Sequence, residues 1–578
     1  MKLPETVTTL NDLFESIKQG KENINFLNYL NNGVWHSLSV GAFYTQTLAL
    51  AKGLQSLGAT SKSRIGILAY SSPHWLMMEF ATHLLGAVSV PIFFNISSKY
   101  LEFELNDAQI DILFTTTDDK IETLLHSDLK ALITLGISKP TDSRKHIVTY
   151  DELLEMGQEQ ALPLLHVKPD DLCTIIYTSG NTGQPKGVML SHHALISQIK
   201  DTAQLFVLDE TDVALSFLPL AHIFERMVMT FYLSQGISVY FADDVKNVAA
   251  LLKTVNPTLM TVVPRLLEKV FVKIRQKVAA TKGIRGLIAK FAWEHARNKP
   301  ASMGKIWFDP LLDTLVYSKF REAFGTRLRM LICGGSALDP EIYNFLVNMG
   351  IHLYQGYGLS EFAPVISANS PLHNRVGTCG RAFPSVHTRL TEDGELLVKG
   401  PSMMLGYLNQ PQKTAETIDE EGWLHTGDLA TIDQEGFITI VGRKKELFKT
   451  STGKYVSPIP MEQRLVKNPY IDFAVVIAEG KPYVTALLFP DHEYIASLGE
   501  SDIKAFFETP AMKRKLRNII WRTNWHCNKW EKIQYYTLIT DPISIETGEL
   551  TPSMKLSRTG VASRFAKEIQ MMYEKDEQ

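Results

Sequence analysis

Residues 177–187, YTSGNTGQPKG, carry the side chains needed to bind an anion with several oxygen atoms. The glycines allow backbone N–H groups to approach a ligand closely, the hydroxyl groups add donors, and Lys186 adds a charge that suits phosphate. The segment differs from the Walker phosphate loop, because Pro185 replaces a glycine and Gly187 replaces the hydroxyl that binds magnesium. Taken alone, it fits either a phosphate loop of another kind or a glycine-rich surface turn.

Three other short segments hold charged side chains in compact patterns. YQGYGLSE (354–361) ends in Glu361, EGWLHTGDLATIDQEGFITIVGRKKE (421–446) contains Asp428 and Arg443, and GELTPSMKLSR (548–558) contains Lys555. A carboxylate can hold a hard cation together with substrate phosphates, and a lysine on a turn can neutralise phosphate charge. Singly, these segments also fit a turn before a helix N-cap, a hairpin loop and an exposed turn.

The elements that must position these residues alternate between short apolar strands and helical patterns. Such alternation predicts parallel α/β sheets covered on both faces. The strands are expected at residues 64–70, 111–117, 214–220, 237–242, 258–263 and 329–335.

The pattern changes to turn-rich hairpins from about residue 375, which predicts a β-rich subdomain. A smaller region with two strands and a helix from about Asp502 follows Arg443. We therefore expect an N-terminal body at residues 1–442 and a small α+β C-terminal domain at residues 443–578.

Composition restricts the class of protein. The 578 residues exceed one hydrophobic core, and a net charge of −3 argues against a general nucleic-acid binder. The four cysteines show no zinc or CxxC spacing, and the N-terminus lacks an apolar run of signal-peptide length, which together predict a cytoplasmic protein. The apolar segment HWLMMEFATHLLGAVSVPIFF is broken by Glu79 and His83 and predicts a buried helix followed by a strand.

One strongly basic stretch lies between Arg265 and Lys305, with eleven Lys or Arg residues against Glu268 and Glu294. Apolar and aromatic residues are interleaved with these charges. The stretch fits a solvated helix face, and it also fits an amphipathic helix that contacts an anionic membrane, such as the inner face of a cell membrane, transiently.

The order and spacing of the four motifs resemble the adenylate-forming, AMP-binding superfamily over residues 25–560. Within it, LPLAHIFER (218–226), GRAFPSVHTRL (380–390) and GRKKELFKTSTGKYVSP (442–458) look most like long-chain fatty acyl-CoA synthetases. The resemblance implies that a fatty acid reacts with Mg-ATP to give acyl-adenylate and pyrophosphate. The small domain then rotates, and coenzyme A displaces AMP to give the thioester.

The resemblance also assigns the nucleotide site. It places the pyrophosphate in the loop at 177–187, where Asn181 replaces the more usual threonine, the adenine against Tyr357, and the ribose hydroxyls on Asp428 and Arg443. The full set implied to bind ATP or coenzyme A is Thr178, Ser179, Gly180, Thr182, Gly183, Lys186, Gly334, Gly335, Ser336, Tyr357, Gly358, Ser360, Asp428, Ile440, Arg443 and Gly453.

The remaining roles follow from the same resemblance. Glu361 is the implied magnesium ligand, Lys186 and Lys555 the lysines that act during adenylation, and Lys445 the hinge of the domain rotation. His222 is implied to line the acyl pocket, although by its sequence context alone it fits a packed core histidine better. Gly453 is implied to leave room for the pantetheine arm of coenzyme A.

Two other functions fit the same motifs. A fatty acyl-AMP ligase would pass the acyl group to a free-standing carrier protein, and a nucleotide or lipid sensor would use the fold without catalysis. The presence of every charged motif residue favours the enzyme.

Overall fold

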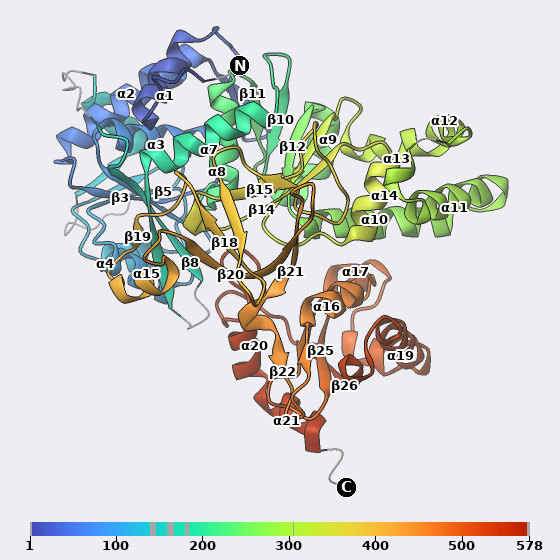
Figure 1. The fold of residues 1–578 in the computed structure, drawn as a ribbon. Coiled ribbons are helices and arrows are strands. Elements are labelled where there is room, and N and C mark those ends of the chain that lie inside the picture. Colours follow the sequence, from blue (N-terminus) through green and yellow to red (C-terminus); the bar gives the residue numbers. More distant parts are fainter. Residues whose placement is uncertain (1–2, 139–145, 159–166, 180–183, 305, 575–578) are drawn as a thin grey trace.

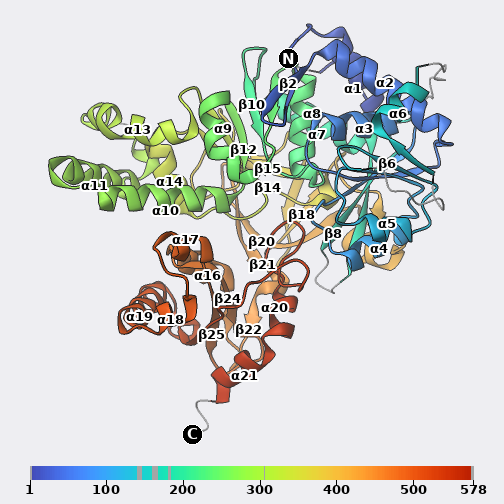
Figure 2. The same ribbon diagram turned by 180° about the vertical axis from the view of Figure 1, so that it is seen from behind.

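A large N-terminal body and a smaller C-terminal domain make up the chain in the computed structural model (Figure 1). The structure describes residues 3–138, 146–158, 167–179, 184–304 and 306–574. For Ser179 and Lys445 it describes the backbone but not the side chain. In Figures 1 and 2 the C-terminal domain, coloured orange to red, lies beneath the body.

One large sheet of the body has nine strands, and its central strands are parallel. Antiparallel strands close both of its ends. Its order is β16 (Arg381–Ala382), β15 (Val365–Ala368), β14 (Leu353–Gly358), β13 (Met330–Cys333), β12 (Leu259–Val262), β10 (Val213–Ser216), β11 (Ser238–Phe241), β1 (Leu27–Asn31) and β2 (Val34–Leu38).

The second large sheet has eight strands, parallel from β8 through β7. Its other end is an antiparallel hairpin to which a short strand is added. Its order is β19 (Gly406–Tyr407), β9 (Pro185–Ser191), β8 (Leu172–Ser179), β4 (Val88–Ile92), β3 (Arg64–Leu68), β5 (Ile112–Thr115), β6 (Ala131–Thr134) and β7 (His146–Thr149). All six predicted strands are present within these two sheets.

Helices pack on both faces of the sheets, as the predicted fold class requires. Side-chain caps fix several of their starts; for example, Ser72 and Ser191 accept hydrogen bonds from the first turns of α3 and α7. Figures 1 and 2 show α3, α7 and α8 between the two large sheets. The helices of this part are α1 (Leu10–Gln19), α2 (Val40–Ser56), α3 (Pro73–Leu84), α4 (Ser98–Asp107), α5 (Ile121–Leu125), α6 (Tyr150–Met156), α7 (His192–Leu205), α8 (Ile223–Ser234) and α9 (Val248–Val255).

A helical projection extends from one side of the body (Figure 1). It contains the basic stretch predicted from the sequence, which folds into two consecutive helices, α10 and α11. Its elements are α10 (Pro264–Ala280), α11 (Gly283–Asn298), α12 (Asp309–Leu312), a π-helical turn (Asp313–Tyr317), α13 (Ser318–Arg321) and α14 (Pro340–Asn348). No helix among the described residues is long and apolar enough to cross a membrane.

A smaller antiparallel sheet carries the chain from the body toward the C-terminal domain. It consists of β17 (His387–Leu390), β18 (Glu395–Lys399), β20 (Leu424–Ile432) and β21 (Ile438–Arg443), and α15 (Pro411–Thr417) precedes β20. These are the hairpins expected from the turn-rich pattern after residue 375.

The C-terminal domain is a three-stranded sheet with helices around it, and it has its own hydrophobic clusters. The α+β pattern predicted for this region is confirmed. Its elements are β22 (Phe448–Lys449), β23 (Tyr455–Val456), α16 (Pro458–Val466), β24 (Ile471–Ile477), β25 (Val484–Pro490), α17 (His492–Ser497), α18 (Ile503–Glu508), α19 (Pro510–Trp525), β26 (Ile533–Leu538), α20 (Arg558–Arg564) and α21 (Ala566–Glu574).

Candidate active site

One corner of the candidate site combines Lys186, Tyr407 and Glu361. The Tyr407 hydroxyl donates to Glu361 Oε1 at 2.7 Å, and the Lys186 ammonium lies 4.9 Å from the centre of the Tyr407 ring. Lys186 is held at the start of β9, directly opposite Thr178 of β8. A lysine, a hydroxyl and a carboxylate therefore meet where the loop predicted to hold phosphate joins its two strands.

A second group consists of Tyr357, Asp428 and Arg443. The Tyr357 hydroxyl donates to Asp428 Oδ2 at 2.6 Å, and Arg443 Nε donates to Asp428 Oδ1 at 3.0 Å. The pairing of β20 with β21 places Asp428 and Arg443 directly opposite each other. Burial and the neighbouring Asp428 carboxylate raise the pKa of Tyr357 well above its usual value, so the hydroxyl stays a donor.

Gly334 and Gly335 form a wall where the chain leaves β13. A Cβ atom on Gly334 would lie 2.7 Å from the Phe224 ring, and Gly335 has φ +89°, so neither position accepts a larger residue without strain. Ser336 follows them and is exposed. Gly358 is equally restricted, because a Cβ atom there would lie 1.8 Å from the Pro364 carbonyl oxygen.

Lys555 reaches the body from the C-terminal domain. Its ammonium donates to the Gly335 carbonyl oxygen at 2.6 Å, and a turn closed by the Thr551 N–H donating to the Lys555 carbonyl presents the side chain. The surrounding protein atoms and the nearby Arg443 charge lower the pKa of Lys555, although solvent still reaches the side chain. A lysine of one domain thus lies at the glycine wall of the other.

His222 caps the N-terminus of α8, where its Nδ1 accepts the Phe224 N–H at 3.2 Å. Burial, together with the nearby Lys555 charge, lowers the pKa of His222 to about 4. The imidazole is therefore neutral near pH 7, and its proton is on Nε2 because Nδ1 is an acceptor. His222 therefore packs as a helix cap near Lys555, and its predicted place in the acyl pocket stays a prediction.

Not every predicted residue joins these groups. Gly180, Thr182 and Gly183 lie outside the described residues. Ser360 and Ile440 are partly buried near the second group, in the turn after β14 and in β21. Gly453 is in the turn between β22 and β23 with φ +79° and no atom within 4 Å of an added Cβ, and Lys445 is in a short 3-10 turn after β21.

Residues 14–408 match the family of AMP-binding enzymes, and residues 446–577 match the AMP-binding enzyme C-terminal domain. The chain belongs to the AMP-binding enzyme family.

Relatives of this AMP-binding enzyme extend over almost its full length. It is 32% identical to the long-chain-fatty-acid–CoA ligase FadD15 of Mycobacterium bovis, covering 95% of this chain and 94% of that protein. It is 29% identical to the peroxisomal long chain acyl-CoA synthetase 6 of Arabidopsis thaliana, covering 94% and 82%. The adenylation domain of the carboxylate reductase of Mycobacterium chelonae has the same fold, with a TM-score of 0.81 at 20% identity, covering 98% and 92%.

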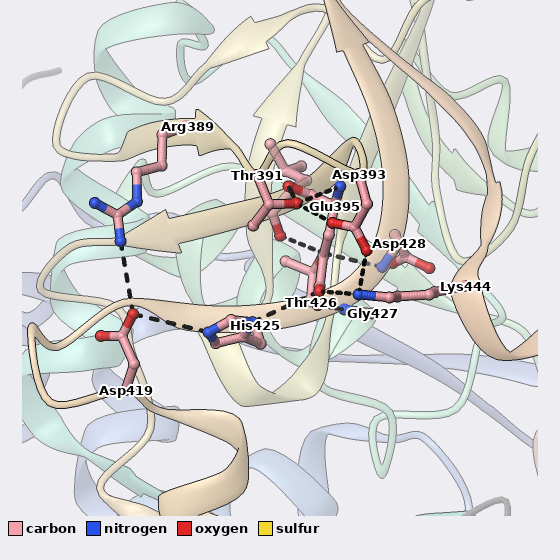
Figure 3. A network of polar contacts seen from close by, with 11 residues as sticks. Arg389, Thr391, Asp393, Glu395, Asp419, His425, Thr426, Gly427, Asp428 and Lys444 are labelled. Atoms are coloured by element: carbon pink, nitrogen blue, oxygen red, sulfur yellow. Dashed lines mark hydrogen bonds and ion pairs between the residues drawn. The ribbon is translucent and has the colours of Figure 1, made fainter.

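In this AMP-binding enzyme a polar network supports the Asp428 segment of β20 and the residue before the predicted hinge (Figure 3). Glu395 of β18 is buried and accepts the Gly427 N–H at 3.0 Å. Lys444 donates to Glu395 Oε2 at 3.1 Å and pairs with Asp393 Oδ2 at 2.6 Å. The residue before Lys445 is therefore fixed to the body by two carboxylates.

Polar contacts also join the two domains of the AMP-binding enzyme. Lys467 of the C-terminal domain pairs with Asp339 at 2.8 Å and Glu341 at 2.6 Å, and Arg265 pairs with Asp472. No hydrophobic cluster found among the described residues contains side chains from both domains. This interface holds Lys555 against the body through charge and hydrogen bonds.

Sequence reasoning did not find Tyr407, Glu395 or Lys444. Tyr407 comes from a two-residue strand added to the edge of β9, and its local sequence has no motif. The sequence signal beside Tyr407 is the preceding glycine, Gly406. In the structure its φ is +142°, a backbone angle that favours glycine. Glu395 and Lys444 are far apart in sequence and meet only through the pairing of β18, β20 and β21.

Proposed function

We propose that this chain activates a fatty acid with ATP and transfers the acyl group to coenzyme A, releasing pyrophosphate and AMP. Its substrate class, long-chain fatty acids, is supported by the names of the relatives reported above. The observation that carries the proposal is the position of Lys555, which reaches from the C-terminal domain to the glycine wall beside Arg443 and His222.

In the first step, a carboxylate oxygen of the fatty acid attacks the α-phosphorus of ATP, and the bond from that phosphorus to the bridging oxygen of pyrophosphate breaks. We assign Lys555 to the attacking carboxylate and the α-phosphate, where it orients one and neutralises charge on the other. We assign Lys186 and the loop at 177–187 to the departing pyrophosphate. Asp428 would accept hydrogen bonds from the ribose hydroxyls, with Tyr357 beside the adenine.

Mg²⁺ fits this site as a cation shared between one carboxylate and the substrate. No group of three or more potential metal-ligating side chains occurs among the described residues, so the remaining ligands would be phosphate oxygens and water, an arrangement common for Mg²⁺. Glu361 is the proposed protein ligand, held by the Tyr407 hydroxyl. When bound, the cation supplies positive charge to the phosphates.

In the second step, the thiol sulfur of coenzyme A attacks the acyl carbonyl and AMP leaves as the thioester forms. We propose that the body ends at residue 442, that the C-terminal domain begins at 443, and that rotation at Lys445 replaces the Lys555 turn with another face of that domain. Gly453 is proposed to leave room for the pantetheine arm. His222 is proposed to line the acyl pocket as a neutral imidazole.

The protein is proposed to act in the cytoplasm and to contact the inner face of a membrane through residues 265–305. All four cysteines, each in the part of the chain that the structure describes, are free thiols, which agrees with a reducing compartment. Contact with a membrane would bring the enzyme to a poorly water-soluble substrate.

The test is to incubate the purified protein with Mg-ATP and fatty acids of graded length, with and without coenzyme A, and to measure pyrophosphate, acyl-AMP, AMP and acyl-CoA. We expect stoichiometric AMP and acyl-CoA, with the highest rate for long chains. Acyl-AMP that accumulates unchanged with coenzyme A present would favour transfer to a carrier protein. The absence of pyrophosphate release would refute the proposal.

A further inference from the structure

Helix α11 is apolar on the face that points away from the protein. Ile284, Leu287 and Phe291 are 77%, 70% and 53% exposed and follow one another at spacings of three and four residues. The buried residues of the helix include Trp293 and Ala296, which lie on the opposite side of a 3.6-residue turn. An exposed helix face normally carries polar residues, so this one requires an explanation.

A second apolar stripe continues this face beyond α11. Trp307, Leu311 and Leu315 are 90%, 59% and 45% exposed and recur every four residues, in the turn before α12, in α12 and in the π-helical turn. Phe308 joins the two stripes, because its ring centre lies 6.0 Å from that of Phe291 and 5.2 Å from that of Trp307. The six exposed residues, Ile284, Leu287, Phe291, Trp307, Leu311 and Leu315, are called the apolar platform below.

Basic residues flank the apolar platform. Lys282, Arg285 and Lys290 are exposed, and among the described residues they have no ion-pair partner. Other basic residues of the same stretch are engaged elsewhere: Arg265 pairs with Asp472 and Lys299 with Asp309. The three exposed basic side chains outweigh Glu294, the acidic residue of α11, so the net charge beside the platform is positive.

We propose that the apolar platform docks on a lipid bilayer that contains anionic lipids. Exposed aromatic and aliphatic side chains would enter the boundary between headgroups and acyl chains, and Lys282, Arg285 and Lys290 would contact the phosphate groups. The positive surround and the exposed Trp307 favour such an interface over a second copy of this chain, whose own platform would have the same charge.

The location of the apolar platform relates it to the proposed function, on which this part of the inference rests. Helix α10 begins directly after Val263, whose Cγ1 lies 3.8 Å from the position that a Cβ atom on Gly335 would take. Its 17 residues extend about 25 Å toward the platform. Docking would hold the body close to a bilayer that dissolves the fatty acid. Figures 1 and 2 both place α11 at the outer end of the helical projection.

The test is flotation of the full-length protein with vesicles of phosphatidylcholine alone or with added phosphatidylglycerol, at low and high salt. The wild type should float with the anionic vesicles, less so at high salt. The variant L287E/F291E/W307E should lose at least tenfold in bound fraction at both salt concentrations. The variant K282E/R285E/K290E should lose as much at low salt.

Matched controls carry the same kinds of change elsewhere. Val207 and Leu372 are 76% and 72% exposed on the body, so V207E/L372E should float like the wild type, as should K62E/K253E. All variants should release AMP from a short, water-soluble fatty acid at the wild-type rate, because none touches the candidate site. That assay reports on the proposed function independently of vesicles.

Three results would overturn the proposal. The first is equal recovery of the wild type with neutral and anionic vesicles, or none with either. The second is flotation of L287E/F291E/W307E at the wild-type level. The third is a wild-type dimer in light scattering that becomes a monomer in this variant, which would assign the apolar platform to self-association.

Discussion

Lys555 is positioned by the turn at 551–555 and by the Gly335 carbonyl oxygen, 2.6 Å from its ammonium group. We predict that Lys555→Ala lowers acyl-AMP formation by about a hundredfold to a thousandfold, because it removes a donor aimed at developing charge. The variant should still convert supplied acyl-AMP and coenzyme A into thioester at nearly the wild-type rate. Rapid-quench measurement of the two half-reactions separates these effects.

Equal losses in both half-reactions would show that Lys555 is not specific to adenylation. The matched control is Lys529→Ala, which changes an exposed lysine of the same domain and should affect neither half-reaction.

Tyr407 fixes the orientation of Glu361 through its hydroxyl. Tyr407→Phe keeps the ring beneath Lys186 and removes the hydroxyl, and with it the hydrogen bond to Glu361, which for a charged acceptor contributes about 1.5 kcal/mol or more. We expect the Mg²⁺ concentration for half-maximal activity to rise by about tenfold. Glu361→Ala should raise it further, and a magnesium titration of each variant measures the difference.

A Tyr407→Phe titration that coincides with the wild type would remove Tyr407 from the proposed magnesium site. The control Tyr70→Phe changes an exposed tyrosine of the body and should leave the titration unchanged.

Single residues differ in how well the sequence predicts them. Lys186, Tyr357, Asp428 and Arg443 belong to local motifs, and the structure brings them into two compact groups. Their roles stay predictions until the variants are measured. Tyr407 and Glu395 reach the site only through strand pairing between distant segments, so no local pattern identifies them.

At the scale of elements, the decisive feature is the passage from β21 into the C-terminal domain. Lys444 is held by Glu395 and Asp393, and the proposed site of the domain rotation is the next residue, Lys445. We predict that Lys445→Pro, which fixes φ and restricts Lys444, lowers thioester formation at least tenfold while adenylation stays within about twofold. Lys445→Ala, with a free φ, should affect both steps little.

The measurement is the pair of half-reaction rates for both Lys445 variants. A Lys445→Pro enzyme that makes thioester at the wild-type rate would mean that rotation occurs at another residue.

Elements were more predictable than their contacts. Strands such as β3 and β12 follow from short apolar runs between helical patterns, and the change after residue 375 marks the antiparallel hairpins. The ion pairs of Arg265 and Lys467 with the other domain were not predictable, because they depend on how the domains are placed. For the same reason the basic stretch gave no indication of which of its charges face outward.

At the scale of the whole molecule, buried histidines link stability to pH. His192 is 1% exposed, and its Nδ1 accepts the Leu10 N–H at 3.3 Å. Burial first, and then the neighbouring His83, lower the pKa of His192 from 6.5 to about 3, with Asp12 acting in the opposite direction. The unfolded chain therefore binds a proton that the folded chain excludes as pH falls below 6.5.

Stability from this histidine is present above pH 6.5 and decreases toward about pH 3, by about 1.4 kcal/mol per pH unit. We predict that His192→Asn, whose amide oxygen can replace Nδ1 as acceptor, reduces the fall in unfolding temperature between pH 6.5 and 5. The comparison with the wild type isolates His192 from other groups, such as Glu225, whose pKa burial raises to about 8. An identical pH dependence in both proteins would refute the assignment.

The charged boundary between the domains has a consequence for repeated turnover. Lys467, Arg265 and Lys120 hold the C-terminal domain through carboxylates of the other side, and no shared hydrophobic cluster lies between the domains in the described residues. Exposing apolar surface costs about 2.5 kcal/mol per 100 Å², whereas water can solvate separated charges. The proposed domain rotation would therefore separate the two domains in each catalytic cycle without exposing a hydrophobic core to water. We also expect dissolved salt to weaken this interface before it unfolds either domain.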